Sequence, residues 1–124
     1  MSNRLYTEDH EWIMVDNGEA TVGVSAHAAE ELGEIVFVEL PKIGTSFSKG
    51  DECASVESVK TVSGIYTPCS GTVCGVNEAV VASPEIINQA PYDSGWLIKL
   101  SVDEAFDSSD LMDEHAYEAY LNSL

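Results

Sequence analysis

Basic side chains are scarce in this chain. Its 124 residues contain five Lys and Arg against 22 Asp and Glu, which gives a formal net charge of −17 at pH 7. Nucleic-acid backbones and anionic membrane surfaces are bound through clustered Lys and Arg. The composition therefore argues against nucleic-acid binding and against attachment to an anionic membrane.

Long apolar runs and recognisable catalytic or metal-binding spacings are also lacking. No run of 18 apolar residues occurs, so no membrane-spanning helix is predicted. The three cysteines form no CxxC pair and the three histidines no His-x-x-x-His pair, so no metal site is predicted. A Gly-rich phosphate loop is missing as well. We expect no catalysis by the isolated chain, although a Cys–His nucleophilic pair stays open at this stage.

The absence of sorting signals and of a disulfide pattern bears on the compartment. The N-terminus has neither an apolar signal segment nor an Arg-rich presequence, and the number of cysteines is odd. Both features favour a reducing compartment. The expectation is a cytoplasmic protein of the bacterial type.

Length and hydrophobic content indicate one domain over residues 1–124. With 44% hydrophobic residues, a chain of this size buries one core without metal or disulfide staples. Acidic residues are dense from position 103 to position 118, where Lys and Arg do not occur: Asp103, Glu104, Asp107, Asp110, Asp113, Glu114 and Glu118. Such a segment either keeps the protein soluble or steers it towards basic docking surfaces.

One of the rare cations stands between two segments with strand character. Glu52–Ser58 alternates polar with small or apolar residues, and Thr61–Thr67 is rich in β-branched and aromatic ones. A hairpin is therefore predicted with Lys60 at its turn. The turn has no Gly, Asn or Asp to supply positive φ. A lysine at the tip of a hairpin suits an amine that another enzyme acylates, and a solvated surface lysine is the plainer alternative.

Further strands are predicted over residues 12–15 and 20–24, around an Asp-Asn-Gly turn, and over residues 34–40 and 96–102. The strand over residues 34–40 has so many apolar neighbours that we expect it to be buried on much of both faces. Ser25 is expected to cap a helix over residues 26–32, which ends at Gly33 in the left-handed conformation.

Two more helices are predicted in the second half of the chain. Ser83-Pro84 reads as an N-cap followed by a first-turn proline, which opens a brief helix through Ile87. A terminal helix is predicted from about residue 109 to residue 122, with Ser108 or Ser109 as its cap and a partial apolar stripe.

Several segments in register resemble one known family. Val56-Glu57-Ser58-Val59-Lys60, followed by Tyr66-Thr67-Pro68-Cys69-Ser70-Gly71, is similar to the lipoylation hairpin of the glycine cleavage system H protein family. The same order and spacing continue in His10-Glu11-Trp12, in residues 33–41, in Val76-Asn77 and in residues 91–99. The resemblance covers residues 5–121, which is nearly the whole chain.

The resemblance implies a fold and a site of modification. Members of the family are mainly β, with a lipoyl/biotinyl-type flattened β-barrel (a barrel-sandwich hybrid), short helices and a C-terminal helix. Lipoic acid is then attached covalently to Lys60, and Glu57, Ser58 and Val59 form the hairpin context of the modification.

The same resemblance implies a cleft that shelters the lipoyl arm, with Glu11 and His10 in its wall. The carboxylate of Glu11 is suited to accept a charge-assisted hydrogen bond from an ammonium group, whereas Trp12 is expected in the core. The family often has an Asp four residues after the lysine, where this chain has Gly64. A second polar contact to the arm is therefore left open.

The implied function is that of a non-catalytic carrier in the glycine cleavage system. Such a carrier moves the aminomethyl group of glycine from a pyridoxal-phosphate glycine decarboxylase to an aminomethyltransferase that uses tetrahydrofolate. A dihydrolipoamide dehydrogenase reoxidises the arm, and a lipoylating enzyme installs it. Tethering raises the effective concentration of the reactive sulfur in each partner's site.

Three alternatives remain beside this interpretation. A biotinyl carrier would use the same fold, but biotin domains typically flank their lysine with methionines, where this chain has Val59 and Thr61. An unmodified β-barrel module that binds a partner through its acidic face would leave Lys60 free. A lipoyl relay would hand the lipoyl group on to 2-oxoacid dehydrogenases.

Overall fold

The computed structural model describes residues 4–102, 109 and 111–124. These residues form nine strands and four helices, in the order β1 (Leu5–Tyr6), β2 (Glu11–Asp16), β3 (Glu19–Val24), α1 (Ala26–Leu32), β4 (Ile35–Glu39), β5 (Ser46–Phe47), β6 (Glu52–Ser58), β7 (Val62–Tyr66), β8 (Gly71–Val76), α2 (Glu78–Ala82), α3 (Glu85–Gln89), β9 (Ile98–Ser101) and α4 (Glu114–Asn122). No helix in this part of the chain is long and apolar enough to span a bilayer. Some residues singled out above lie outside the described residues: Asp103, Glu104, Asp107, Ser108 and Asp110.

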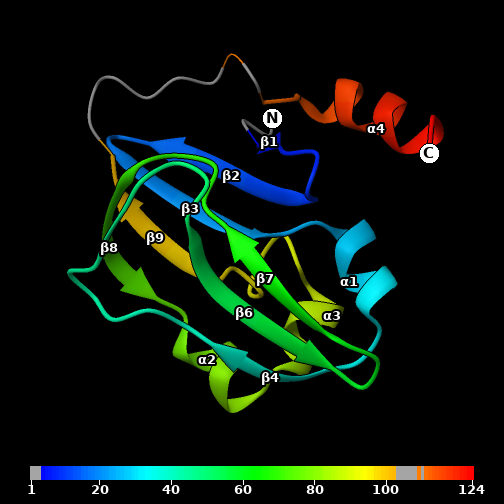
Figure 1. Ribbon diagram of the computed structural model, residues 1–124, viewed down its shortest axis with the longest axis horizontal. Coiled ribbons are helices and arrows are strands. Elements are labelled where there is room, and N and C mark those ends of the chain that lie inside the picture. The colour runs from blue at the N-terminus through cyan, green and yellow to red at the C-terminus, as the bar shows by residue number, and fades with distance from the viewer. Residues whose placement is uncertain (1–3, 103–108, 110) are drawn as a thin grey trace.

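The strands form two antiparallel sheets (Figure 1). One sheet has the order β1-β2-β3-β9-β8-β5, and the other has the order β4-β6-β7. No ladder joins the two sheets within the described residues, so the barrel is flattened and not closed. The predicted mainly β, barrel-like fold with short helices and a C-terminal helix is confirmed.

Apolar side chains from both sheets meet in one core, to which β2, β3, β4, β6, β7, β8 and β9 contribute. A second cluster of Tyr6, Trp12 and Tyr117 joins β1 and β2 to α4. Trp12 is 1% exposed, and its indole N–H donates to the carbonyl of Pro91 at 2.9 Å. The predicted core position of Trp12 is therefore confirmed.

The turn between β2 and β3 and the N-cap of α1 are confirmed. Asn17 and Gly18 have φ of 51° and 79° and turn the chain from β2 into β3, as the primed hairpin turns require. The hydroxyl of Ser25 accepts a hydrogen bond from the N–H of Ala28 at 3.1 Å and caps α1. Gly33 ends α1 with a φ of 79°, but its ψ of −154° is extended, so the expected left-handed helical conformation is not adopted.

The prediction that the strand over residues 34–40 is buried on both faces is wrong. Ile35 and Val38 are buried, whereas Val36 and Phe37 are 44% and 53% exposed. The register of β4 against β6 shifts between Ile35 and Phe37. A β-bulge of this kind inserts one extra residue, so two successive side chains leave the core instead of one.

The two helices predicted for the second half begin later than the sequence suggested. The carboxylate of Asp113 accepts from the N–H of Ala116 at 2.8 Å and starts α4 at Glu114, not near residue 109. Met112 pairs with Tyr6 through two backbone hydrogen bonds of 2.7 Å and 2.9 Å, which keeps the preceding segment extended. The brief helix through Ile87 is present as α3, but Pro84 stands at its N-cap and makes no side-chain capping bond.

Candidate functional site

Lys60 lies in the turn that joins β6 to β7, as predicted. The hydroxyl of Ser58 accepts hydrogen bonds from the N–H groups of Lys60 and Thr61, both at 3.1 Å. The N–H of Ser58 donates to the carbonyl of Thr61 at 2.8 Å, and the N–H of Val59 donates to the carbonyl of Glu34 at 3.1 Å. These bonds fix the turn without a positive-φ residue.

Ser58 therefore has a structural role that the sequence interpretation missed. It was expected only as context for the modification, yet its side chain is 5% exposed and supplies the acceptor around which the turn closes. Serine hydroxyls are known to organise turns by bonding to backbone N–H groups two or three residues ahead. The sequence signal for this role is a serine at the first position of a turn that contains no glycine.

The side chain of Lys60 lies over the C-terminal end of α1. A Cβ placed on Gly33 would be 3.4 Å from Cε of Lys60, so Gly33 leaves room for the lysine stem. A hollow of about 240 Å³ beside the stem is lined by His27, Glu30, Glu31 and Lys60. Lys60 forms no ion pair with any described residue, so no such bond must break when the amine reacts.

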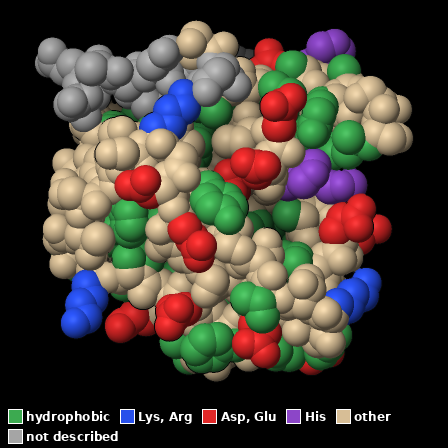
Figure 2. All heavy atoms as spheres, viewed as in Figure 1, with side chains coloured by type: hydrophobic (Ala, Val, Ile, Leu, Met, Phe, Trp, Pro, Cys, Tyr) green, Lys and Arg blue, Asp and Glu red, His purple; other side chains and the backbone are tan. Residues whose placement is uncertain are grey.

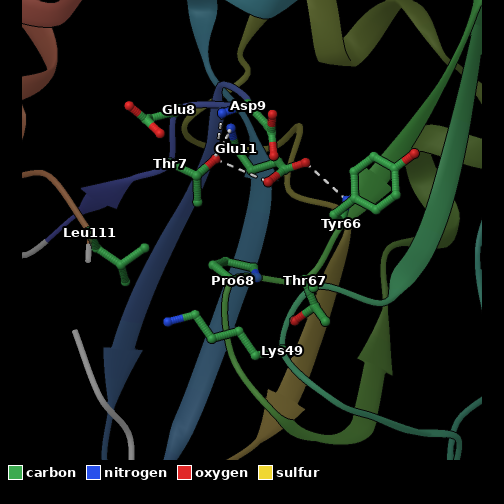
Figure 3. A pocket seen from close by; sticks show the side chains of 10 residues that line it. Thr7, Glu8, Asp9, Glu11, Lys49, Tyr66, Thr67, Pro68 and Leu111 are labelled. Carbon is green, nitrogen blue, oxygen red and sulfur yellow. Dashed lines mark hydrogen bonds between the residues drawn. The ribbon is translucent and has the colours of Figure 1, made fainter. Parts of the chain in front are cut away.

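Glu11 at the start of β2 is a buried carboxylate, 2% exposed. It accepts hydrogen bonds from the hydroxyl of Thr7 at 3.0 Å and from the backbone N–H of Tyr66 at 2.9 Å (Figure 3). Burial raises the pKa of Glu11 to about 7, although these two bonds act in the opposite direction. A carboxyl group with this pKa releases its proton to solvent near neutral pH when a cation binds beside it.

The carboxylate of Glu11 faces a second hollow, also of about 240 Å³ (Figure 3). The segment Thr7–Asp9, the loop residues Lys49 and Gly50, and Tyr66–Pro68 at the end of β7 line this hollow together with Leu111. Tyr66 and Lys60 stand at opposite ends of β7. An extended chain rises about 3.3 Å per residue, so the two hollows lie up to about 20 Å apart.

His10 turns away from Glu11, its neighbour in the sequence. It has a φ of 68°, and it does not line the hollow at Glu11. Its ring centroid lies 4.6 Å from that of His27, and its Nδ1 lies 2.8 Å from the hydroxyl of Tyr117. Burial and the nearby His27 lower the pKa of His10. His10 therefore connects α4 with α1, which carries the wall of the hollow at Lys60.

The cysteines offer no nucleophile that neutral pH would activate. Cys53, Cys69 and Cys74 are all free. Burial raises the pKa of Cys53 to about 12 and that of Cys69 to about 11, so both stay as thiols. Among the described residues, no three His, Cys, Asp or Glu side chains come together in a group that would hold a metal ion.

Comparisons with known proteins agree with the fold. The family model described as "Glycine cleavage H-protein" matches residues 4–124. Glycine cleavage system H proteins of Listeria monocytogenes serotype 4a and Listeria welshimeri are 48% identical to the chain over 118 residues, covering 95% of this chain and 94% of theirs. The crystal structure of a glycine cleavage system H protein from Mycobacterium marinum is similar with a TM-score of 0.89 and 39% identity, covering 100% of this chain and 99% of that chain.

Proposed function

This chain belongs to the glycine cleavage H-protein family, and we propose that Lys60 is the residue through which it carries lipoic acid. As a member of that family it is a lipoyl carrier of the glycine cleavage system and not a catalyst. Its role is to move the aminomethyl group of glycine from the decarboxylase to the aminomethyltransferase. A lipoyl group in amide linkage to the lysine supplies the dithiolane sulfur that holds the aminomethyl group.

The observation that carries this proposal is the exposed amine at a turn whose backbone is fixed. Ser58 holds the N–H groups of Lys60 and Thr61, and Val59 is bonded back to Glu34. Glu57 precedes this turn on the outer face of β6 and is exposed. A rigid turn holds the backbone of Lys60 in one conformation, which lowers the entropy lost when an enzyme binds the turn.

The position of Glu11 at the far end of β7 from Lys60 supports it as the second part of the site. In the described sheet β7 pairs only with β6, and its other edge runs from the turn at Lys60 to Tyr66, where Glu11 accepts the backbone N–H. We assign to Glu11 the binding of the ammonium group at the far end of a loaded arm. An arriving cation favours the ionised carboxylate, so Glu11 would release its proton at that point.

His10 has a supporting role in this proposal. Its ring packs on His27, which lines the hollow at Lys60, and it is bonded to Tyr117 of α4. His10 thus holds α1 against α4 and does not contact the ammonium group itself.

The partners follow from the assignment. We propose that the carrier meets a pyridoxal-phosphate glycine decarboxylase, a tetrahydrofolate-dependent aminomethyltransferase and a dihydrolipoamide dehydrogenase, after a lipoylating enzyme has acted on Lys60. The named relatives are bacterial, which supports a cytoplasmic location for this set of reactions.

The test is the intact mass of the protein from its native cells, followed by peptide mapping around Lys60. We expect a lipoyl increment on Lys60 that is lost in Lys60→Arg and kept in the matched control Lys42→Arg. A biotin increment would instead identify a biotinyl carrier. A Lys60 that stays unmodified in cells that make lipoate would leave an interaction module without a cofactor.

A further inference from the structure

Four exposed apolar side chains surround the turn at Lys60. Val59 is 66% exposed within the turn, and Val62 is 64% exposed at the start of β7. Val36 and Phe37 of the neighbouring strand β4 are 44% and 53% exposed. We call these four residues the apolar collar.

Strand register brings the collar together on one face of the three-stranded sheet. Phe37 pairs with Glu57 of β6, and Glu57 pairs with Val62 of β7. Directly paired residues project on the same face, and adjacent strands lie about 4.8 Å apart. Phe37 and Val62 are therefore about 10 Å apart, with Glu57 between them, and Val59 stands at the end of the same hairpin.

The β-bulge in β4 places two successive apolar side chains on this face. Ile35 pairs with Ser58 and Phe37 with Glu57, so Val36 has no partner of its own. Both Val36 and Phe37 consequently leave the core. Contiguous exposed apolar groups are a cost that soluble proteins keep mainly at interaction sites. The bulge places Val36 and Phe37 next to each other on the outer face, while Ile35 and Val38 on either side of them point into the core.

Acidic side chains flank the collar. Glu57 lies between Phe37 and Val62, and Glu34 precedes β4 and is exposed. Glu30 and Glu31 line the hollow beside Lys60. Figure 2 shows hydrophobic and acidic side chains interspersed over the front of the molecule, with Lys and Arg towards its margins. A complementary partner therefore presents an apolar patch flanked by Lys or Arg.

We propose that the apolar collar is the docking surface of the enzyme that acylates Lys60. This inference rests on the proposed modification of Lys60. It names the surface that the modifying enzyme binds. The amine sits on a stem of four carbons. A catalytic centre that reaches Nζ must therefore bring its rim onto the residues beside the turn. Enzymes that act on the distal end of an attached arm have no such need.

The chemical step fixes what the docked enzyme must do. Nζ of Lys60 loses a proton to a base or to solvent and attacks the acyl carbon of a lipoyl adenylate. The amide bond forms and AMP leaves; ATP was consumed in the preceding step, in which lipoate and ATP gave the adenylate and pyrophosphate. Contact with the collar holds the amine at the acyl carbon for long enough to react.

The experiment compares acylation of purified unmodified protein by a lipoate–protein ligase with ATP and lipoate. Phe37→Ser and Val62→Ser are the test variants, and Ile43→Ser is the matched control because Ile43 is 65% exposed but outside the collar. We expect kcat/KM to fall by about tenfold in each test variant, mainly through KM, as is typical for a central contact of an interface. The control is expected to stay within about twofold of the parent protein. Thermal unfolding of each variant checks that the fold is kept.

A second readout separates docking from a general defect. After exhaustive lipoylation, the rate at which dihydrolipoamide dehydrogenase and NADH reduce the arm is expected to be the same in the test variants and the parent protein. Acylation at the parent rate in both test variants would overturn the proposal, and so would equal losses in the two assays. A parent protein that the ligase does not modify at Lys60 would instead overturn the proposed function.

Discussion

The carboxylate of Glu52 occupies the space that a side chain at position 64 would need. A Cβ on Gly64 would lie 3.0 Å from Cδ of Glu52 and 3.2 Å from the hydroxyl of Tyr66. Glu52 pairs with Tyr66, whereas Gly64 pairs with Ser55, so the contact is diagonal across β6 and β7. The neighbouring strand thus provides a carboxylate at the place where the family resemblance led us to expect an aspartate.

Gly64→Asp is expected to lower the free energy of unfolding by about 1 kcal/mol, because two carboxylates would then share one position on adjacent strands. In a Glu52→Ala background the same change is expected to cost much less. Urea denaturation of the four proteins gives the coupling energy directly. Gly64→Asn, of the same size but uncharged, is the control. An equal cost of Gly64→Asp in both backgrounds would mean that Glu52 is not the obstacle.

Glu11 is expected to make stability depend on pH. Its pKa is raised from 4.5 to about 7 in the folded protein, so the folded state favours the protonated form. This contribution is fully present below pH 4.5 and is lost as the pH rises through 7. The free energy of unfolding should fall by about 2 kcal/mol between pH 5 and pH 8 from this carboxyl group alone.

Glu11→Gln is the variant that isolates this effect, since it keeps the shape but cannot ionise. The difference in unfolding free energy between the parent protein and Glu11→Gln should change with pH in the same window, and Glu8→Gln at an exposed neighbouring position should not reproduce it. A difference that stays constant from pH 5 to pH 8 would show that Glu11 does not titrate there.

Ser58→Ala is expected to destabilise the protein by about 1–2 kcal/mol, because the N–H groups of Lys60 and Thr61 lose their shared acceptor. The turn would then sample several conformations, so the rate of lipoylation should also fall. Chemical denaturation and ligase kinetics measure the two effects. Ser58→Thr keeps the hydroxyl and should retain most of both quantities. If Ser58→Ala matches the parent protein in stability and rate, the hydroxyl does not hold the turn.

Tyr117→Phe is expected to loosen α4. The hydroxyl lies 2.8 Å from Nδ1 of His10 and 2.7 Å from Oγ of Ser25, and removing it leaves both groups without this partner at a cost of about 1–2 kcal/mol. The ring still stacks on Tyr6, with centroids 4.3 Å apart. Amide hydrogen exchange in residues 114–122 should accelerate. Tyr120→Phe, whose hydroxyl makes a longer bond of 3.4 Å, should change exchange much less.

The elements that sequence predicted well are those decided within a few residues. Ser25 and Gly33 bound α1 through bonds to nearby backbone groups, and Asn17 with Gly18 fixes the turn between β2 and β3. The hairpin at Lys60 was also predictable, because a segment with strand character stands on each side of it.

The features that sequence did not predict depend on distant partners. The exposure of Val36 and Phe37 follows from how β4 pairs with β6, which no local pattern reveals. The contact of His10 with Tyr117 joins residues 107 positions apart. Burial of Glu11 likewise depends on the backbone of Tyr66, 55 positions away.

The pairing of Tyr6 with Met112 has a practical consequence. It holds β1 and the segment that leads into α4 together on one side of the molecule, away from the turn between β6 and β7 (Figure 1). A chain anchored to a sensor surface through an affinity tag at either end would therefore present the amine of Lys60 to the solution. Fusion to a fluorescent reporter at either end should likewise leave the acylation site accessible.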